Sequence, residues 1–124
     1  MNLSAIGIPC KDIQKSLLFY KELGLEFIKY SEQHFETKPS NGTKIMLDSY
    51  DLLKELDPHW KEPINPSIVL GFEQQSPNDV DRLFEHMTQM GHRKVTVPWD
   101  APWGQRYCNI LDPDGNQIDI YAEL

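Results

Sequence analysis

The tryptophans of this chain are the side chains whose type and placement most directly suggest binding chemistry. Trp99 and Trp103 bracket a turn-rich loop from Pro98 to Pro102, and Trp60 lies in a connecting segment. The face of a tryptophan ring can stack on a flat ligand or hold a cation, for about 0.5–2 kcal/mol depending on desolvation. The alternative is that these rings close the edges of the core or a dimer interface.

Charged and polar residues could complete such a site. Asp48 and Asp119 could supply charge complementarity to a cation. Arg106 could clamp a carboxylate or phosphate, but pairing with a loop aspartate such as Asp100 or Asp112 is favoured. Three further side chains could line a cleft and orient a ligand by hydrogen bonds: Tyr107, Asn109 and Tyr121.

Two neighbouring carboxylates, Asp112 and Asp114, are better explained by a turn than by acid–base catalysis. They belong to the segment Asp-Pro-Asp-Gly-Asn, in which Gly115 can take a positive φ and the aspartate side chains can bond to the backbone. We therefore expect a structural turn here.

The histidines and cysteines give no clear catalytic or metal-binding pattern. Cys10 and Cys108 lie in expected strands far apart in sequence, without a CxxC pair. They are interpreted as reduced thiols, with one disulfide left open. The four histidines are expected off the cleft-facing side of the strands, in structural or surface roles: His34, His59, His86 and His92.

Length and charge restrict the class of protein. The 124 residues correspond to one domain, and 40% hydrophobic with 25% charged residues is typical of a globular chain. The net charge of −7 disfavours nucleic acid as a partner. No apolar run is long enough to cross a bilayer, and Met1 is not followed by a basic and then an apolar stretch. We expect a cytoplasmic protein that binds neither membrane nor nucleic acid.

Two amphipathic helices must position these residues. One begins after Asp12 and ends before Gly24, and the other begins at Ser76-Pro77 and ends at Gly91. At an offset of 67, seven positions agree in type, which indicates an internal duplication rather than two amphipathic helices matching by chance.

The strands support the duplication. Each half reads as strand, helix and three strands, which divides the chain into modules of about 1–62 and 63–124. Alternate residues of the strands form an apolar set that should face the helices: Ile6, Ile8, Ile45, Leu47, Ile68, Leu70, Phe72, Ile118 and Ile120. The opposite face is small, mixed and partly polar. It fits a sheet curving around a cleft, with a plain solvated face as the alternative.

An Asn41-Gly42 turn is expected before the strand from Thr43 to Asp48.

Four segments in order resemble the vicinal oxygen chelate superfamily, which includes glyoxalase I, extradiol dioxygenases, fosfomycin-resistance enzymes and bleomycin-resistance proteins. They are residues 12–20, residues 23–27, Pro102-Trp103-Gly104-Gln105-Arg106, and Asp112 to Asn116 followed by Ile118-Asp119-Ile120. The resemblance covers nearly the whole chain. It implies an α+β fold, with two βαβββ modules forming a cupped mixed sheet with helices on its outer face, in a single domain over 1–124. It also implies a homodimer.

The resemblance also implies where a divalent metal would bind. Metal-dependent members take His, Gln and Glu ligands from the first and last strand of each module. These places fall at Ala5, Met46, Ser67 and Asp119, of which only Asp119 is a good ligand for a hard ion. A register slip could bring in Asp48, and Cys10 or His34 could approach. The family's metal site is expected to be absent, and no cofactor is predicted.

Three functions remain open. The first is metal-independent binding of a small cationic or aromatic ligand, closest in type to bleomycin-resistance proteins, with no catalytic residue. The second is a divalent-metal-dependent lyase, isomerase or dioxygenase, and the third is a structural or regulatory dimer with a vestigial cleft. The expected ligand-binding residues are Met46, Asp48, Trp60, Ser67, Trp99, Trp103, Arg106, Tyr107, Asn109, Asp119 and Tyr121.

Overall fold

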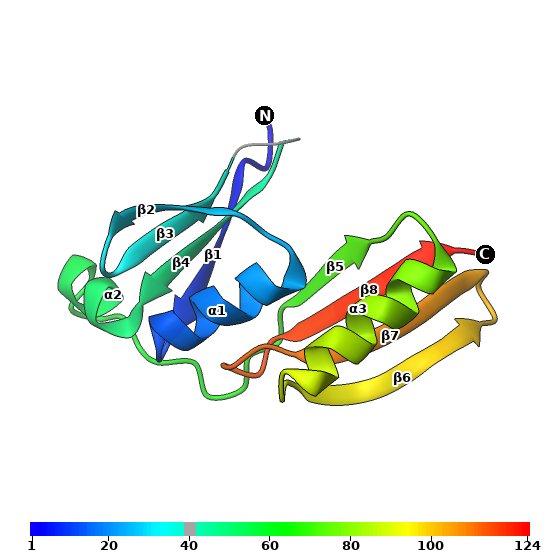
Figure 1. The fold of residues 1–124 in the computed structure, drawn as a ribbon. Helices are drawn as coiled ribbons and strands as arrows, with labels where there is room; N and C mark the ends of the chain where they lie inside the picture. Colours follow the sequence, from blue (N-terminus) through cyan, green and yellow to red (C-terminus); the bar gives the residue numbers. More distant parts are fainter. Residues whose placement is uncertain (39–41) are drawn as a thin grey trace. The chain divides into compact units, whose positions relative to one another are not determined.

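The computed structural model describes residues 1–38 and 42–124, which form two four-stranded mixed sheets and three helices (Figure 1). This confirms the α+β class. Internal contacts divide the chain into two units, Met1–Ile64 and Asn65–Leu124. Asn41 of the expected Asn41-Gly42 turn lies outside the described residues.

The first unit contains four strands and two helices. Its sheet has the order β1-β4-β3-β2, with β1 parallel to β4 and the other pairs antiparallel. The elements are β1 (Ala5–Cys10), α1 (Ile13–Leu23), β2 (Phe27–Ser31), β3 (His34–Thr37), β4 (Lys44–Ser49) and α2 (Tyr50–Leu56).

The second unit repeats the plan with one helix. Its sheet has the order β5-β8-β7-β6, again with the first strand parallel to the last. The elements are β5 (Val69–Glu73), α3 (Pro77–Gln89), β6 (Arg93–Ala101), β7 (Gln105–Leu111) and β8 (Gln117–Glu123). Both units therefore have the βαβββ order that the sequence predicts.

Local capping explains why both long helices start where they do. The Asp12 side chain accepts a hydrogen bond from the Lys15 backbone N–H, and Ser76 does the same for Asp79. Gly24 ends α1 in the left-handed conformation at φ 116°, which a residue with a Cβ rarely adopts. The predicted helix ends agree with these caps.

The apolar strand face packs on the helix side of each sheet and forms the core. Ile8, Leu47, Ile118 and Ile120 are fully buried, as predicted from alternation. In Figure 1, α3 lies across the β5-β8-β7-β6 sheet. Ile68 departs from the prediction, because it precedes β5 and is exposed.

The turn between β7 and β8 has the structure that its sequence predicts. The buried Asp112 side chain accepts hydrogen bonds from the backbone N–H groups of Asp114, at 3.0 Å, and Asn116, at 2.8 Å. Gly115 adopts φ 92°. Asp112 is thus engaged in closing this turn.

Two strand boundaries differ from the expectation. Trp99 lies inside β6, opposite Tyr107, rather than in a loop. Pro98 is tolerated in this strand because β6 is at the sheet edge and carries register irregularities. Ser67 lies before β5 and is exposed, so it is not a strand residue.

Both cysteines are buried, lie in different units and are not joined by a disulfide. Burial raises the pKa of Cys108 to about 12. We expect neither thiol to react with Ellman's reagent in the native protein, because both are shielded from solvent and the reactive thiolate of Cys108 is suppressed as well. Two thiols should react once urea unfolds the chain. Rapid labelling of the native protein, or no thiol in the unfolded one, would contradict this prediction.

Candidate functional site

Side chains of the second unit form an aromatic and polar surface on the sheet face away from the core. Asn109 is directly opposite Asp119, and Tyr107 is opposite Tyr121. Their neighbours Cys108, Ile110, Ile118 and Ile120 point the other way and are fully buried. We call this surface the aromatic face, defined by Trp99, Trp103, Tyr107, Asn109, Asp119 and Tyr121.

Three rings of the aromatic face make a continuous row. Trp99 and Trp103 meet edge to face with centroids 5.6 Å apart, and Trp103 and Tyr107 meet similarly at 5.4 Å. Trp99 is 40% exposed and Trp103 is 58% exposed. Gln105 accepts a hydrogen bond from the Trp103 indole N–H at 2.9 Å, which fixes the ring orientation. Large rings held in place but left open to solvent suit a flat ligand.

The row ends at a polar cluster. The hydroxyl of Tyr107 is hydrogen-bonded to Asp119 and accepts from the Asn109 amide at 3.2 Å. Burial and the negative charge of Asp119 raise the pKa of Tyr107, so the phenol stays neutral. Gln117 donates to Asp119 at 2.9 Å.

One acceptor of this cluster lacks a partner. Asn109 is 7% exposed, and its Oδ1 has no hydrogen-bond partner within the described part of the chain. Buried carbonyl oxygens are nearly always hydrogen-bonded. The cluster therefore presents the Asp119 carboxylate to a group that donates hydrogen bonds, and it holds an unsatisfied amide oxygen buried beside it.

A glycine on the first strand lies beside the equivalent position on the last strand of each sheet. Asp119 lies beside Gly71 on β5, and in the first unit Met46 lies beside Gly7 on β1. A Cβ on Gly71 would approach the Tyr121 ring to 3.4 Å. Met46 and Asp119 are thus equivalent in the two repeats, as predicted, whereas the first-strand neighbours are glycines rather than Ala5 and Ser67.

The first unit carries a charged network on the face of its sheet that bears Met46. His34 on β3 is directly opposite Asp48 on β4. Its Nδ1 contacts Asp48, and its Nε2 lies 2.6 Å from Glu36 Oε2. Lys44 donates to Glu36 at 2.7 Å. We call Asp48, His34, Glu36 and Lys44 the His34 network.

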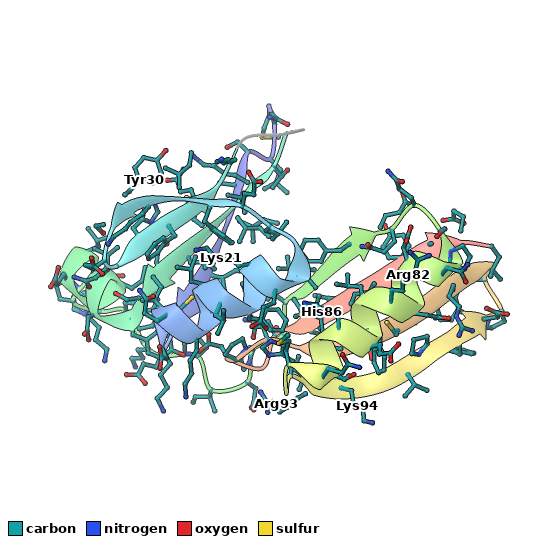
Figure 2. The ribbon with its side chains drawn as sticks, in the orientation of Figure 1. Lys21, Tyr30, Arg82, His86, Arg93 and Lys94 are labelled. Carbon is teal, nitrogen blue, oxygen red and sulfur yellow. The ribbon has the colours of Figure 1, made fainter. Side chains whose placement is uncertain are left out.

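The network favours a protonated His34. Burial alone would lower the pKa of His34, but hydrogen bonds and attraction from Glu36 and Asp48 outweigh it and raise that pKa. The hydrogen bond from Lys44, and then that from His34, lower the pKa of Glu36. The Tyr30 ring lies 5.8 Å from the His34 ring and projects from β2 away from α1 (Figure 2).

The prediction that all four histidines avoid this face is wrong for His34. Alternation along β3 places His34 and Glu36 on one side and buries Phe35 on the other. Cross-strand pairing with β4 then brings Asp48 to the same side. The alternation of His34, Phe35 and Glu36 is therefore a local signal that could have placed His34 on this face.

Comparison with protein families identifies the fold. A family model described as the Glyoxalase/Bleomycin resistance protein/Dioxygenase superfamily matches residues 2–120. The chain belongs to this superfamily. Bleomycin resistance proteins of Geobacillus stearothermophilus and Staphylococcus aureus are each 25% identical over 131 residues, covering 95% of this chain and 94% of theirs.

Solved structures share the superfamily fold. A glyoxalase-related enzyme from Fulvimarina pelagi is 20% identical, with a TM-score of 0.86 over 98% of this chain and 88% of that one. A lactoylglutathione lyase from Agrobacterium tumefaciens is 17% identical, with a TM-score of 0.74 over 96% of this chain and 91% of that one. At these identities the likeness shows the fold alone.

The donor set does not fit the metal site that the superfamily resemblance implies. Met46 supplies only a thioether, and the adjacent Gly7 supplies no side chain. Both His34 ring nitrogens already contact carboxylates, whereas a metal-bound histidine must offer one nitrogen to the ion. No group of three or more His, Cys, Asp or Glu able to hold a metal occurs among residues 1–38 and 42–124.

The remaining predicted site residues lie elsewhere. Arg106 points away from the aromatic face and pairs with Asp81 on α3, at 2.9 and 3.2 Å, and with Asp100 at 3.2 Å. The favoured pairing with Asp100 is present, whereas Asp112 is engaged in its turn. Trp60 contacts the Tyr50 ring in the first unit, with centroids 5.1 Å apart.

Within the described residues, no helix is long and apolar enough to cross a membrane.

Proposed function

We propose that the chain binds a small, flat, cationic molecule against the aromatic face, without a metal ion and without chemical change. The observation that carries the proposal is the row Trp99–Trp103–Tyr107 ending beside Asp119 and the unpartnered Asn109 Oδ1. Exposed rings provide stacking area, and the carboxylate provides charge for a cationic N–H group. The similarity to bleomycin resistance proteins supports a binding role over a catalytic one.

Metal independence is part of this proposal. Its support is the poor donor set around Met46 and the full engagement of His34 with carboxylates. The protein should be incubated with Mn²⁺, Ni²⁺ and Zn²⁺, desalted and examined by elemental mass spectrometry. About one ion retained per chain would favour the metal-dependent lyase, isomerase or dioxygenase instead.

Binding is tested with a planar cation and a neutral molecule of the same shape. Proflavine and acridine in mildly alkaline buffer form such a pair, and their titration can be followed by tryptophan fluorescence and calorimetry. We expect proflavine to bind with saturation and acridine to bind at least about tenfold more weakly, since the Asp119 charge attracts only the cation. Equal affinities would contradict the role of Asp119, and no binding of either would favour a vestigial cleft.

We further propose that the chain forms a homodimer through β6. This strand lies at the edge of its sheet and exposes Val95 and Val97. Exposed strand edges with apolar side chains favour pairing with another chain.

A charge on β6 should weaken the dimer. We expect Val97→Lys to shift the molecular mass measured by light scattering towards that of a single chain. Leu56→Lys, on the exposed part of α2, is the control and should leave the mass unchanged. A wild-type protein of one-chain mass at all concentrations, or an unchanged dimer in Val97→Lys, would contradict the use of this edge.

A further inference from the structure

A groove in the first unit lies on the side of its sheet opposite to the His34 network. It has a volume of about 430 Å³, which is within the range of small-molecule sites of about 300–1,000 Å³. Residues from one face of α1, from β2 and β3 and from the turn between them form its walls: Gln14, Leu17, Lys21, Phe27, Lys29, Glu32 and Phe35. We call it the α1–β2 groove.

The two repeats explain why space remains here. In the second unit, α3 packs against β6, β7 and β8, whereas α1 packs chiefly against β4. The helix-facing side of β2 and β3 is therefore less covered by α1 than the same side of β6 and β7 is by α3. Phe35 is directly opposite Lys29 in the β2–β3 pairing, so both side chains belong to this side.

The floor of the groove is apolar and firmly placed. Leu17 and Phe35 are buried, and Phe27 is half-buried. Gln14, Leu17 and Lys21 are spaced three and four residues apart on α1, so they stack along one side of the helix. Figure 2 shows Lys21 on this helix.

The rim of the groove is positively charged. Lys21 and Lys29 contribute two positive charges and Glu32 one negative charge, which leaves one positive charge. Lys29 is ion-paired with Glu32. No ion pair joins Lys21 to any of the described residues. An apolar floor below an exposed ammonium group complements an apolar body with a single anionic head.

We propose that the α1–β2 groove binds a small monoanionic amphiphile, a ring or short chain carrying one carboxylate or sulfonate. The apolar body lies on Leu17, Phe27 and Phe35, and the anionic group lies near Lys21. This site rests on the first unit alone. It is independent of the ligand proposed for the aromatic face, and its failure would leave that proposal intact.

Nuclear magnetic resonance mapping with defined ligands tests the location. Octanoate and 1-naphthalenesulfonate represent chain and ring bodies, and 1-naphthalenemethanol is a neutral control. We expect amide shifts in α1, β2 and β3 with at least one of the two anions, and weaker binding of the alcohol. Shifts confined to β6, β7 and β8, or equal binding of the alcohol, would overturn the proposal.

Variants on α1 test the binding mode. Gln14→Trp should fill the groove and abolish binding, whereas Lys15→Trp, one residue along on the exposed helix surface, should not change it. Lys21→Gln should weaken anion binding by about two- to fivefold, the range for an exposed charge pair. Unchanged affinity in both Gln14→Trp and Lys21→Gln would overturn the proposal. If Gln14→Trp does not fold, the Lys21 variant and the amide shifts decide.

A second copy of this chain is the other occupant that the test must detect. Amide shifts at the groove that depend on protein concentration without added ligand would identify it as an interface between copies. That result would overturn the amphiphile site. Trp103→Ala should leave binding in the groove unchanged, since Trp103 belongs to the aromatic face.

Discussion

Replacing His34 by alanine is expected to lower the free energy of unfolding by about 1–2 kcal/mol near pH 6. The substitution leaves Asp48 and Glu36, both largely shielded from solvent, without the imidazolium that contacts each of them. Hydrogen bonds to charged groups contribute about 1.5–3 kcal/mol, and we discount this range because all three side chains keep some solvent contact. Glu36 retains Lys44, which limits the loss.

The pH dependence of this effect has a definite direction. The folded chain raises the pKa of His34 above 6.5, so its stabilisation is full below that value and is lost as pH rises through the folded pKa. The pKa of Glu36 is lowered below 4.5, so its contribution is present above that value and is lost as pH falls through the folded pKa. Both contributions are fully present between pH 4.5 and 6.5.

Urea unfolding of wild type and variant at several pH values measures this difference. His86→Ala is the matched control, because His86 is exposed on α3 and belongs to the other unit. The difference in free energy of unfolding between wild type and His34→Ala should become smaller as pH rises above the folded pKa of His34. A difference that stays constant with pH, or that grows at alkaline pH, would contradict a charged His34 network.

Local signals account for most of what the sequence predicts correctly. Asp12 and Gly24 define the ends of α1, because the cap hydrogen bond and the positive φ depend on those residues alone. The turn at Asp112 likewise depends on five consecutive residues. The alternation of Ile118 and Ile120 predicts the buried face of β8, because one side of the strand packs on the core.

Features that depend on register between strands are harder to predict. His34 meets Asp48 because β3 and β4 pair in the register that sets these two residues directly opposite each other. Nothing within either strand alone specifies that register. Aligning the helices by sequence gives an offset of 67, whereas the N-caps Asp12 and Ser76 and the paired strand residues Gly7 and Gly71 all differ by 64. The offset of 67 is therefore wrong by about one helical turn, because apolar residues recur every three to four positions along an amphipathic helix.

Removing the charge of Asp119 is expected to weaken proflavine binding by about tenfold while leaving the fold intact. Asp119→Asn keeps the shape of the side chain and a hydrogen-bond acceptor beside Tyr107, but it loses the charge that attracts the cation. A tenfold loss of affinity corresponds to about 1.4 kcal/mol.

Trp103→Ala removes the central ring of the row. It should weaken proflavine binding by about two- to thirtyfold, because cation–aromatic attraction contributes about 0.5–2 kcal/mol.

Matched controls separate this effect from a general loss of charge or area. Asp51→Asn changes the net charge equally at an exposed position of α2, and Leu56→Ala removes an exposed apolar side chain there. Neither should alter proflavine affinity.

Asp119→Asn should have little effect on stability. Asp119 is half-buried and accepts a hydrogen bond from Gln117, so the substitution should change the free energy of unfolding by less than about 1 kcal/mol. A loss above about 3 kcal/mol would mean that this carboxylate supports the fold. Unchanged proflavine affinity would mean that the cation does not bind at the aromatic face.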